Sequence, residues 1–420
     1  MPFRPCVLWS IVFVAVFLSE DAAAQIQVPR DFTAWKDVRN AEAVPGWASG
    51  MLRRDFSGVT GTDREKLLAK NLSALKNIAA DADVVPSTRY NAILAAGQLV
   101  SVEPSPGNLP VAYPIALTYL IEVYQEPTSP HYLQYGALLG IVRHTNSVID
   151  PVQRNTVIDL LLKTATTEFE AGEITLDSVP LEPATWDWFR QTALDGLTAL
   201  KTVGTNGKVV TELLAVINHQ SQELEELTDT LDMLTRDEWE RSRRVTELAS
   251  KTAKTLGDFV YTSETNIDAK KMTDAFIRLT KAVCDINGKM ATDFIEQGKT
   301  SLNSAILRER ITINVKMCTQ SVGWGIRGGF LPVNPAVKPA ENSFYASLAP
   351  DDSAVRRLDI LLVEIIGLAA FLDEGDGTKR PVLSANLPKE FQFDLPALRD
   401  ALVKISEILT KIQREEDGKP

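Results

Sequence analysis

Apolar side chains spaced three and four residues apart recur along almost the whole chain, and this period constrains the fold most. Between residues 62 and 205 the pattern forms short helices in pairs. The hexapeptide at 89–94 (RYNAIL) returns in similar form at 134–139 (QYGALL), a shift of 45 residues. Helix pairs that recur at such an interval bury their apolar faces against neighbouring copies. The sequence therefore predicts an all-α fold of stacked helix pairs.

Helix start signals support this division. Thr62 and Glu65 have the spacing of a capping box, in which each side chain satisfies a backbone N–H at the helix start. Proline, which fits the first turn of a helix, stands at the expected starts of later helices: Pro86, Pro110, Pro130 and Pro151. We expect three pairs in this region, the third ending with a helix over about 186–200.

A recurring polar position marks the second helix of each pair. Asp83 stands six residues before Arg89, and small residues follow: Ala92, Ala95, Ala96 and Gly97. The second copy has Thr128 and Gln134 at the two charged positions. The third copy has Ala184 and Arg190 there.

Residues 62–205 resemble a HEAT/armadillo-type helical repeat array on these features. In that family an Asp and an Arg occupy the two positions, so the resemblance implies an ion pair between Asp83 and Arg89. It also implies an α-solenoid. The chain is similar, too, to uncharacterised secreted bacterial HEAT-like proteins, a resemblance that implies a fold and no activity.

The pattern changes after the repeats. We predict HEAT-like repeats over 62–220, then a long-helix segment over 221–322 in which apolar residues follow alternating steps of three and four. Residues 323–352, rich in Gly and Pro, are predicted to be a linker or long loop. Residues 353–420 are expected to form a terminal helix pair that covers the end of the array.

The N-terminal residues form a separate unit. Arg4, a short apolar run and the small-residue stretch Ala22-Ala23-Ala24 have the pattern of a secretory signal peptide over 1–24, with cleavage before Gln25. The apolar run is too short to cross a bilayer. We therefore expect a periplasmic or secreted protein with no stable membrane insertion after cleavage, beginning with an irregular arm over 25–61.

Composition excludes several classes of protein. With 45% hydrophobic and 24% charged residues, the chain is typical of a globular protein, and 3 Cys cannot support a disulfide scaffold. The formal net charge is −11, and no stretch is rich in Lys or Arg. Nucleic-acid binding requires clustered positive charge, so nucleic acid is excluded as a partner.

Motifs for catalysis or cofactor binding are weak. The glycines at 323–328 match G-x-G-x-x-G as a string, but a helix precedes them instead of the strand that a dinucleotide site needs. The three histidines, His131, His144 and His219, lack metal-ligand spacing, and Ser49 is one position away from a nucleophile elbow. We expect no catalytic, cofactor or metal site from these patterns.

Two features leave alternatives open. Cys284 and Cys318 lie symmetrically about an expected helical turn, so they either form a disulfide in an oxidising compartment or remain buried free thiols. Trp188 points away from the apolar stripe of its helix. It is either a partner contact or packs under an insertion at 171–179.

Together these observations favour an exported helical-repeat scaffold or protein-protein interaction module, whose partner is a protein or an envelope polymer. The reasoning goes from fold to function by analogy, because stacked repeats provide extended binding surfaces. The alternative is a secreted enzyme of the polysaccharide lyase or hydrolase type, with carboxylates, Tyr and Arg in a concave groove.

Overall fold

The computed structural model describes Phe56, residues 58–169, 175–176, 179–230, 235–262, Thr265, and residues 267–297, 301–332, 337–350, 352–374 and 394–416. The expected signal peptide at 1–24 and nearly all of the arm at 25–61 lie outside these residues. The same holds for most of the insertion at 171–179.

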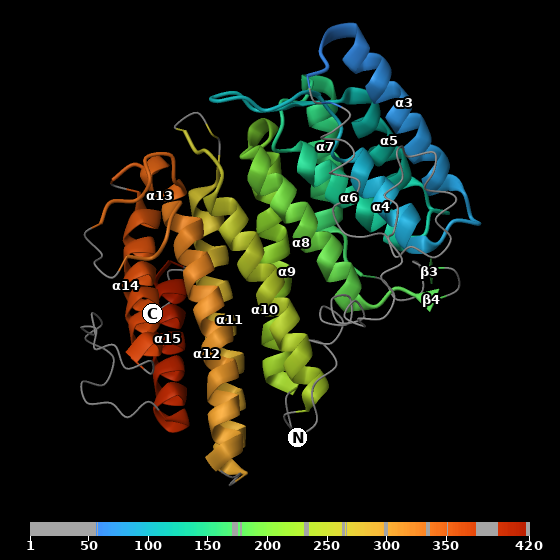
Figure 1. Ribbon diagram of the computed structural model, residues 1–420. Helices are drawn as coiled ribbons and strands as arrows, with labels where there is room; N and C mark the ends of the chain where they lie inside the picture. The colour runs from blue at the N-terminus through green and yellow to red at the C-terminus, as the bar shows by residue number, and fades with distance from the viewer. Residues whose placement is uncertain are drawn as a thin grey trace.

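The described residues are helical almost throughout (Figure 1), which confirms the all-α class. The shorter helices are α3 (Gly61–Ala80), α4 (Pro86–Ala96), α5 (Pro114–Gln125), α6 (His131–His144), α7 (Pro151–Thr166) and α8 (Pro183–Leu200). The later helices are α9 (Lys208–Thr230), α10 (Arg236–Gly257), α11 (Ala269–Glu296), α12 (Ser301–Arg327), α13 (Phe344–Ser347), α14 (Ser353–Glu374) and α15 (Leu395–Glu416).

Small non-α elements lie between the helices. Two antiparallel hairpins pair β1 (Val100–Val102) with β2 (Val111–Ala112) and β3 (Thr175–Leu176) with β4 (Val179–Pro180). A 3-10 turn, η2 (Thr205–Gly207), precedes α9.

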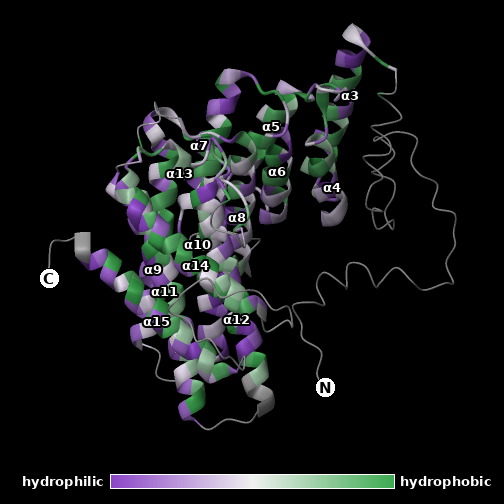
Figure 2. Cartoon of the chain, turned by 90° about the vertical axis from the view of Figure 1, so that its left-hand side faces the viewer, coloured by the Kyte–Doolittle hydropathy of each residue, from purple (hydrophilic) through white to green (hydrophobic). Residues whose placement is uncertain are grey.

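Contacts between helices follow two rows. One row is α4, α6, α8, α10, α12 and α14; the other is α5, α7, α9, α11 and α15, while α3 packs on α4. The rows lead from α3 at one end to the α14 and α15 pair at the other (Figure 1). Apolar and polar residues share nearly every helix (Figure 2), as the helical period requires. One continuous apolar core runs between the rows from Phe56 to Ile412.

The recurring polar position has the same structural role in all three pairs. Each side chain donates a hydrogen bond to a carbonyl at the end of the preceding helix: Arg89 Nε to Ala79 at 2.9 Å, Gln134 Nε2 to Glu126 at 3.0 Å, and Arg190 Nε to Ala165 at 3.0 Å. The last carbonyls of an α-helix have no partner within the helix. The second helix of each pair therefore caps the first.

This contact replaces the ion pair that the HEAT resemblance implies. Among the described ion pairs, none joins Asp83 to Arg89, because the Arg89 guanidinium is directed to the end of α3 and lies over the Tyr132 ring, 5.9 Å from its centroid. The Asp83 side chain is exposed, and its backbone N–H donates to the Asp81 carboxylate. The expectation of an Asp83 partner for Arg89 was wrong.

We expect Arg89→Met to lower the free energy of unfolding by about 1–2 kcal/mol, because the half-buried Ala79 carbonyl loses a charged donor while the aliphatic stem is kept. Asp83→Asn is the matched control and should change stability by less than about 0.5 kcal/mol. Urea unfolding measures both values. Equal losses of unfolding free energy in the two variants would indicate that Asp83 and Arg89 do form an ion pair.

The end of α12 differs from the sequence expectation. The helix continues to Arg327, so Gly323 and Gly325 are helical and do not open a linker. A Cβ at Gly325 would lie 2.6 Å from the Ala253 carbonyl oxygen, which shows how closely α12 crosses α10. The chain then folds back on α12, where Arg327 donates to the Val337 carbonyl and accepts from the Ala340 N–H. Glycine at this site serves close packing.

Candidate functional site

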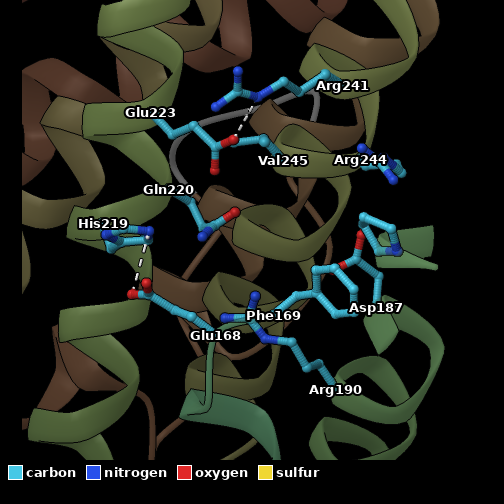
Figure 3. Close-up of a pocket in the computed structure, with 11 residues that line it drawn as sticks. Glu168, Phe169, Asp187, Arg190, His219, Gln220, Glu223, Arg241, Arg244 and Val245 are labelled. Carbon is cyan, nitrogen blue, oxygen red and sulfur yellow. Dashed lines mark hydrogen bonds and ion pairs between the residues drawn. The ribbon is translucent and has the colours of Figure 1, made fainter. Parts of the chain in front are cut away.

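A polar pocket of about 250 Å³ lies where α8, α9 and α10 meet, and Figure 3 shows the side chains that line it. Glu168 and Phe169, just after α7, form one wall. The pocket is therefore built at the junction between the third helix pair and the long helices that follow.

Local sequence signals place the charged side chains of α10 and α9. A capping box between Thr235 and Glu238 fixes the start of α10, so that Arg241 and Arg244 follow one turn apart. On α9, His219 and Glu223 are four residues apart and therefore share a face. These two helices are consecutive and pack against each other, which brings both faces to the same pocket.

Helix α8 supplies Asp187 and Arg190, again one turn apart. Arg190 is only 5% exposed, and its Nε is held by the Ala165 carbonyl. The same bond that caps α7 thus fixes this guanidinium at the pocket, with its two terminal nitrogens free of protein acceptors in the described part of the chain.

Two ion pairs lie on opposite sides of the opening (Figure 3). His219 Nε2 is 3.3 Å from Glu168 Oε1, and Arg241 Nε donates to Glu223 Oε1 at 2.8 Å. Gln220 lies between them, is 4% exposed, and directs its amide into the opening. Glu223 therefore already has a cationic partner, and Glu168 lies against the His219 imidazole.

Arg244 and Asp187 lack such partners. The Nε of Arg244 is buried and has no hydrogen-bond partner, and Asp187 has only longer-range electrostatic neighbours within the described residues. Burial raises the pKa of Asp187, although the charges of Arg190 and Arg244 act in the opposite direction. Burial also lowers the pKa of Arg190, against the effect of Asp187 and the two glutamates. The pocket therefore holds ionisable groups that have no direct partner among the described residues.

Trp188, the candidate partner contact, is 59% exposed on α8 and is not part of the pocket lining. Its neighbour Trp186 is buried, stacks on Phe189 and donates from Nε1 to the Thr167 carbonyl. Whether Trp188 contacts a partner stays a prediction, because most of the insertion at 171–179 lies outside the described residues.

Cys284 and Cys318 are buried free thiols on α11 and α12. The structure thus contains the second of the two alternatives and no bridge between them. Burial raises the pKa of Cys318 to about 12, offset in part by the Ser250 hydroxyl, and raises the pKa of Cys284 as well. Thiols of this kind behave as small apolar residues.

Most of the pocket residues are not evident from the sequence. Arg190 is recognisable there as a repeat residue and His219 as an isolated histidine, and no sequence pattern connects the two. The available signal was the recurrence of charged residues three or four apart on three successive helices, as in Asp187 and Arg190. That signal alone is common on solvated helix faces, so only packing distinguishes this case.

The comparisons with known proteins found no matching family model, no matching curated protein and no matching solved structure. Across the described residues no helix is both long and apolar enough to cross a membrane. Nor does any cluster of three or more His, Cys, Asp or Glu in that part of the chain have an arrangement suited to a metal ion.

Proposed function

We propose that the protein is an exported helical-repeat scaffold that binds another molecule, a protein or an envelope polymer, at the α8–α10 pocket. One observation carries this proposal: Arg244 and Asp187 are held by packed helices without direct partners inside the described chain. Charged groups removed from water are costly unless something pairs with them. A binding partner would supply the missing contacts.

Two parts of this proposal rest on sequence. Export is inferred from the pattern at residues 1–24, and the relation to HEAT-type repeats is inferred from the helix pairs over 62–205. The two rows of helices support the second inference, because each pair contacts mainly its neighbours in the rows.

A second candidate is the secreted enzyme of the lyase or hydrolase type. The observation that favours it is Asp187, a carboxyl group whose pKa is raised by burial in a cleft that also contains arginines. A carboxyl group whose pKa is raised in a cleft is a candidate general acid. In that case Asp187→Asn would abolish turnover of an envelope polysaccharide while leaving its binding intact.

The binding proposal is tested by affinity capture from the native envelope fraction with the full mature chain. Arg241→Glu places a negative charge beside Glu223 at the pocket and should lower partner recovery at least about fivefold, as expected for loss of a charged contact. Arg243→Glu is the matched control, because Arg243 lies on the same helix and pairs outside the pocket with Glu240 and Glu247. It should leave recovery unchanged.

Circular dichroism should show that both variants remain folded, since exposed ion pairs contribute little to stability. If recovery is the same for Arg241→Glu and the native protein, the pocket is not where the partner binds. If the two variants lose the partner equally, general charge and not the pocket drives the interaction.

A further inference from the structure

We propose that the α8–α10 pocket recognises a single anionic group, a carboxylate or a phosphate, through the guanidinium groups of Arg190 and Arg244 and the amide of Gln220. This inference rests on the proposed function and names the chemistry of the partner at the same site.

The first argument is the fixed position of Arg190. Its Nε is occupied by the Ala165 carbonyl at 3.0 Å, so the guanidinium is oriented before any ligand arrives. The two terminal nitrogens of Arg190 are available to a ligand, and the side chain as a whole is nearly fully buried. A guanidinium held in this way loses little conformational freedom on binding, which favours affinity.

The second argument is the contrast between neighbouring arginines on α10. Arg241 pairs with Glu223 at 2.8 Å, and Arg243 pairs with Glu247 at 2.8 Å. Arg244 also lines the pocket, but its buried Nε has no acceptor among the described residues. Arg241 and Arg243 are thus neutralised by the protein's own carboxylates, whereas Arg244 has no such direct partner in the described part of the chain.

The third argument concerns the carboxylates that could oppose an anion. Glu223 is paired with Arg241 at 2.8 Å, and the His219 imidazole lies 3.3 Å from Glu168, so both carboxylates already have a contact within the protein. Asp187 is the remaining acidic group of the lining, and its burial favours the neutral form, which raises its pKa. With Glu223 paired to Arg241 and Asp187 shifted toward its neutral form, the guanidinium groups of Arg190 and Arg244 remain available to a negative ligand.

The size of the pocket limits the ligand to one group. A volume of about 250 Å³ corresponds to roughly eight water molecules at about 30 Å³ each. This is enough to receive one sugar ring or one acidic side chain, with the rest of a larger partner outside the opening. Both carboxylate and phosphate match the planar fork of a guanidinium. The two chemistries therefore have to be separated by experiment.

The experiment is isothermal titration of the full mature protein with three probes: glucuronate, inorganic phosphate and uncharged glucose. We expect saturable binding of at least one anion and none of glucose. Arg244→Gln should weaken that binding at least about tenfold, since a charged contact is lost. Arg243→Gln, the matched control one residue away, should stay within about twofold.

Arg244→Lys is the second variant. It keeps the positive charge but removes the planar pair of N–H donors of the guanidinium. It should bind with an affinity between the native protein and Arg244→Gln, and its circular dichroism should match the native spectrum. Preference for glucuronate assigns the site to carboxylates, and preference for phosphate assigns it to phosphoryl groups.

The proposal is overturned if neither anion binds saturably, or if Arg243→Gln weakens binding as much as Arg244→Gln. Partner capture that still depends on Arg241 in the absence of anion binding would refute this inference and leave the proposed function intact. Anion binding without any captured partner would support this inference and contradict the proposed function.

Discussion

Replacing Gly257 with alanine is expected to destabilise the protein by about 3 kcal/mol, although alanine is the better helix former by about 1 kcal/mol. Gly257 is the last residue of α10, where this helix crosses α12. A Cβ at this position would overlap the carbonyl oxygen of Trp324 and lie 2.6 Å from its Cδ1. The steric clash therefore opposes the higher helix propensity of alanine, and we expect the clash to determine the sign of the change in stability.

The backbone of α12 has little freedom to move away. The Trp324 carbonyl accepts a hydrogen bond from the Gly328 N–H at 2.8 Å, and the Trp324 indole donates to Asp258 at 2.9 Å. A shift large enough to admit a methyl group would strain both bonds. The obstacle is backbone, which cannot relax by changing a rotamer.

Urea unfolding of Gly257→Ala against Gly329→Ala tests this expectation. A Cβ at Gly329 would have no neighbour within 4 Å, so that variant should change the free energy of unfolding by less than about 0.5 kcal/mol. A Gly257→Ala protein as stable as the native one would mean that α10 and α12 can separate without cost.

The sequence was most informative where local rules decide the structure. Helix pairs, the starts near Pro86, Pro130 and Pro151, and the recurrence of Arg89, Gln134 and Arg190 follow from short-range patterns, and the structure contains them. Two start signals were wrong: α5 begins at Pro114 and not at Pro110, and α3 begins at Gly61 after Thr60, without a capping box between Thr62 and Glu65. The partner of the recurring residue was predicted wrongly for Arg89. The family pattern directed attention to Asp83, whereas unsatisfied carbonyls at a helix end need a donor in every helix pair.

The pocket could not be predicted in the same way. Its lining runs from Glu168 to Val245 and comes from three helices and the segment after α7, so its existence depends on how these elements pack together. The spacing of apolar residues shows which face of a helix is buried. It does not show which polar residues at the edge of that face contact polar residues of a neighbouring helix. The glycines at 323–328 illustrate the same limit, because close helix crossing and a flexible linker both favour glycine.

Acid should destabilise the protein through His144, the last residue of α6. This side chain is 1% exposed, and its Nε2 has no hydrogen-bond partner in the part of the chain that the structure describes. Burial lowers its pKa from 6.5 to about 4, and the charge of Arg143 acts in the same direction. The helix C-terminus would favour an imidazolium by about 0.3–1 kcal/mol, up to about 2 when partly buried, but desolvation outweighs it.

The sign follows from proton binding. Between pH 6.5 and about 4 the unfolded chain binds a proton at His144 that the folded chain does not, so stability falls as the pH falls through this range. The loss at pH 4 relative to pH 7 should be about 3 kcal/mol. In His144→Gln this contribution is absent, while the carboxylates titrate as before. Urea unfolding of both proteins at pH 7 and pH 4 isolates the contribution of His144. An equal decline in the free energy of unfolding of the two proteins would mean that His144 is protonated in the folded protein as easily as in the unfolded chain.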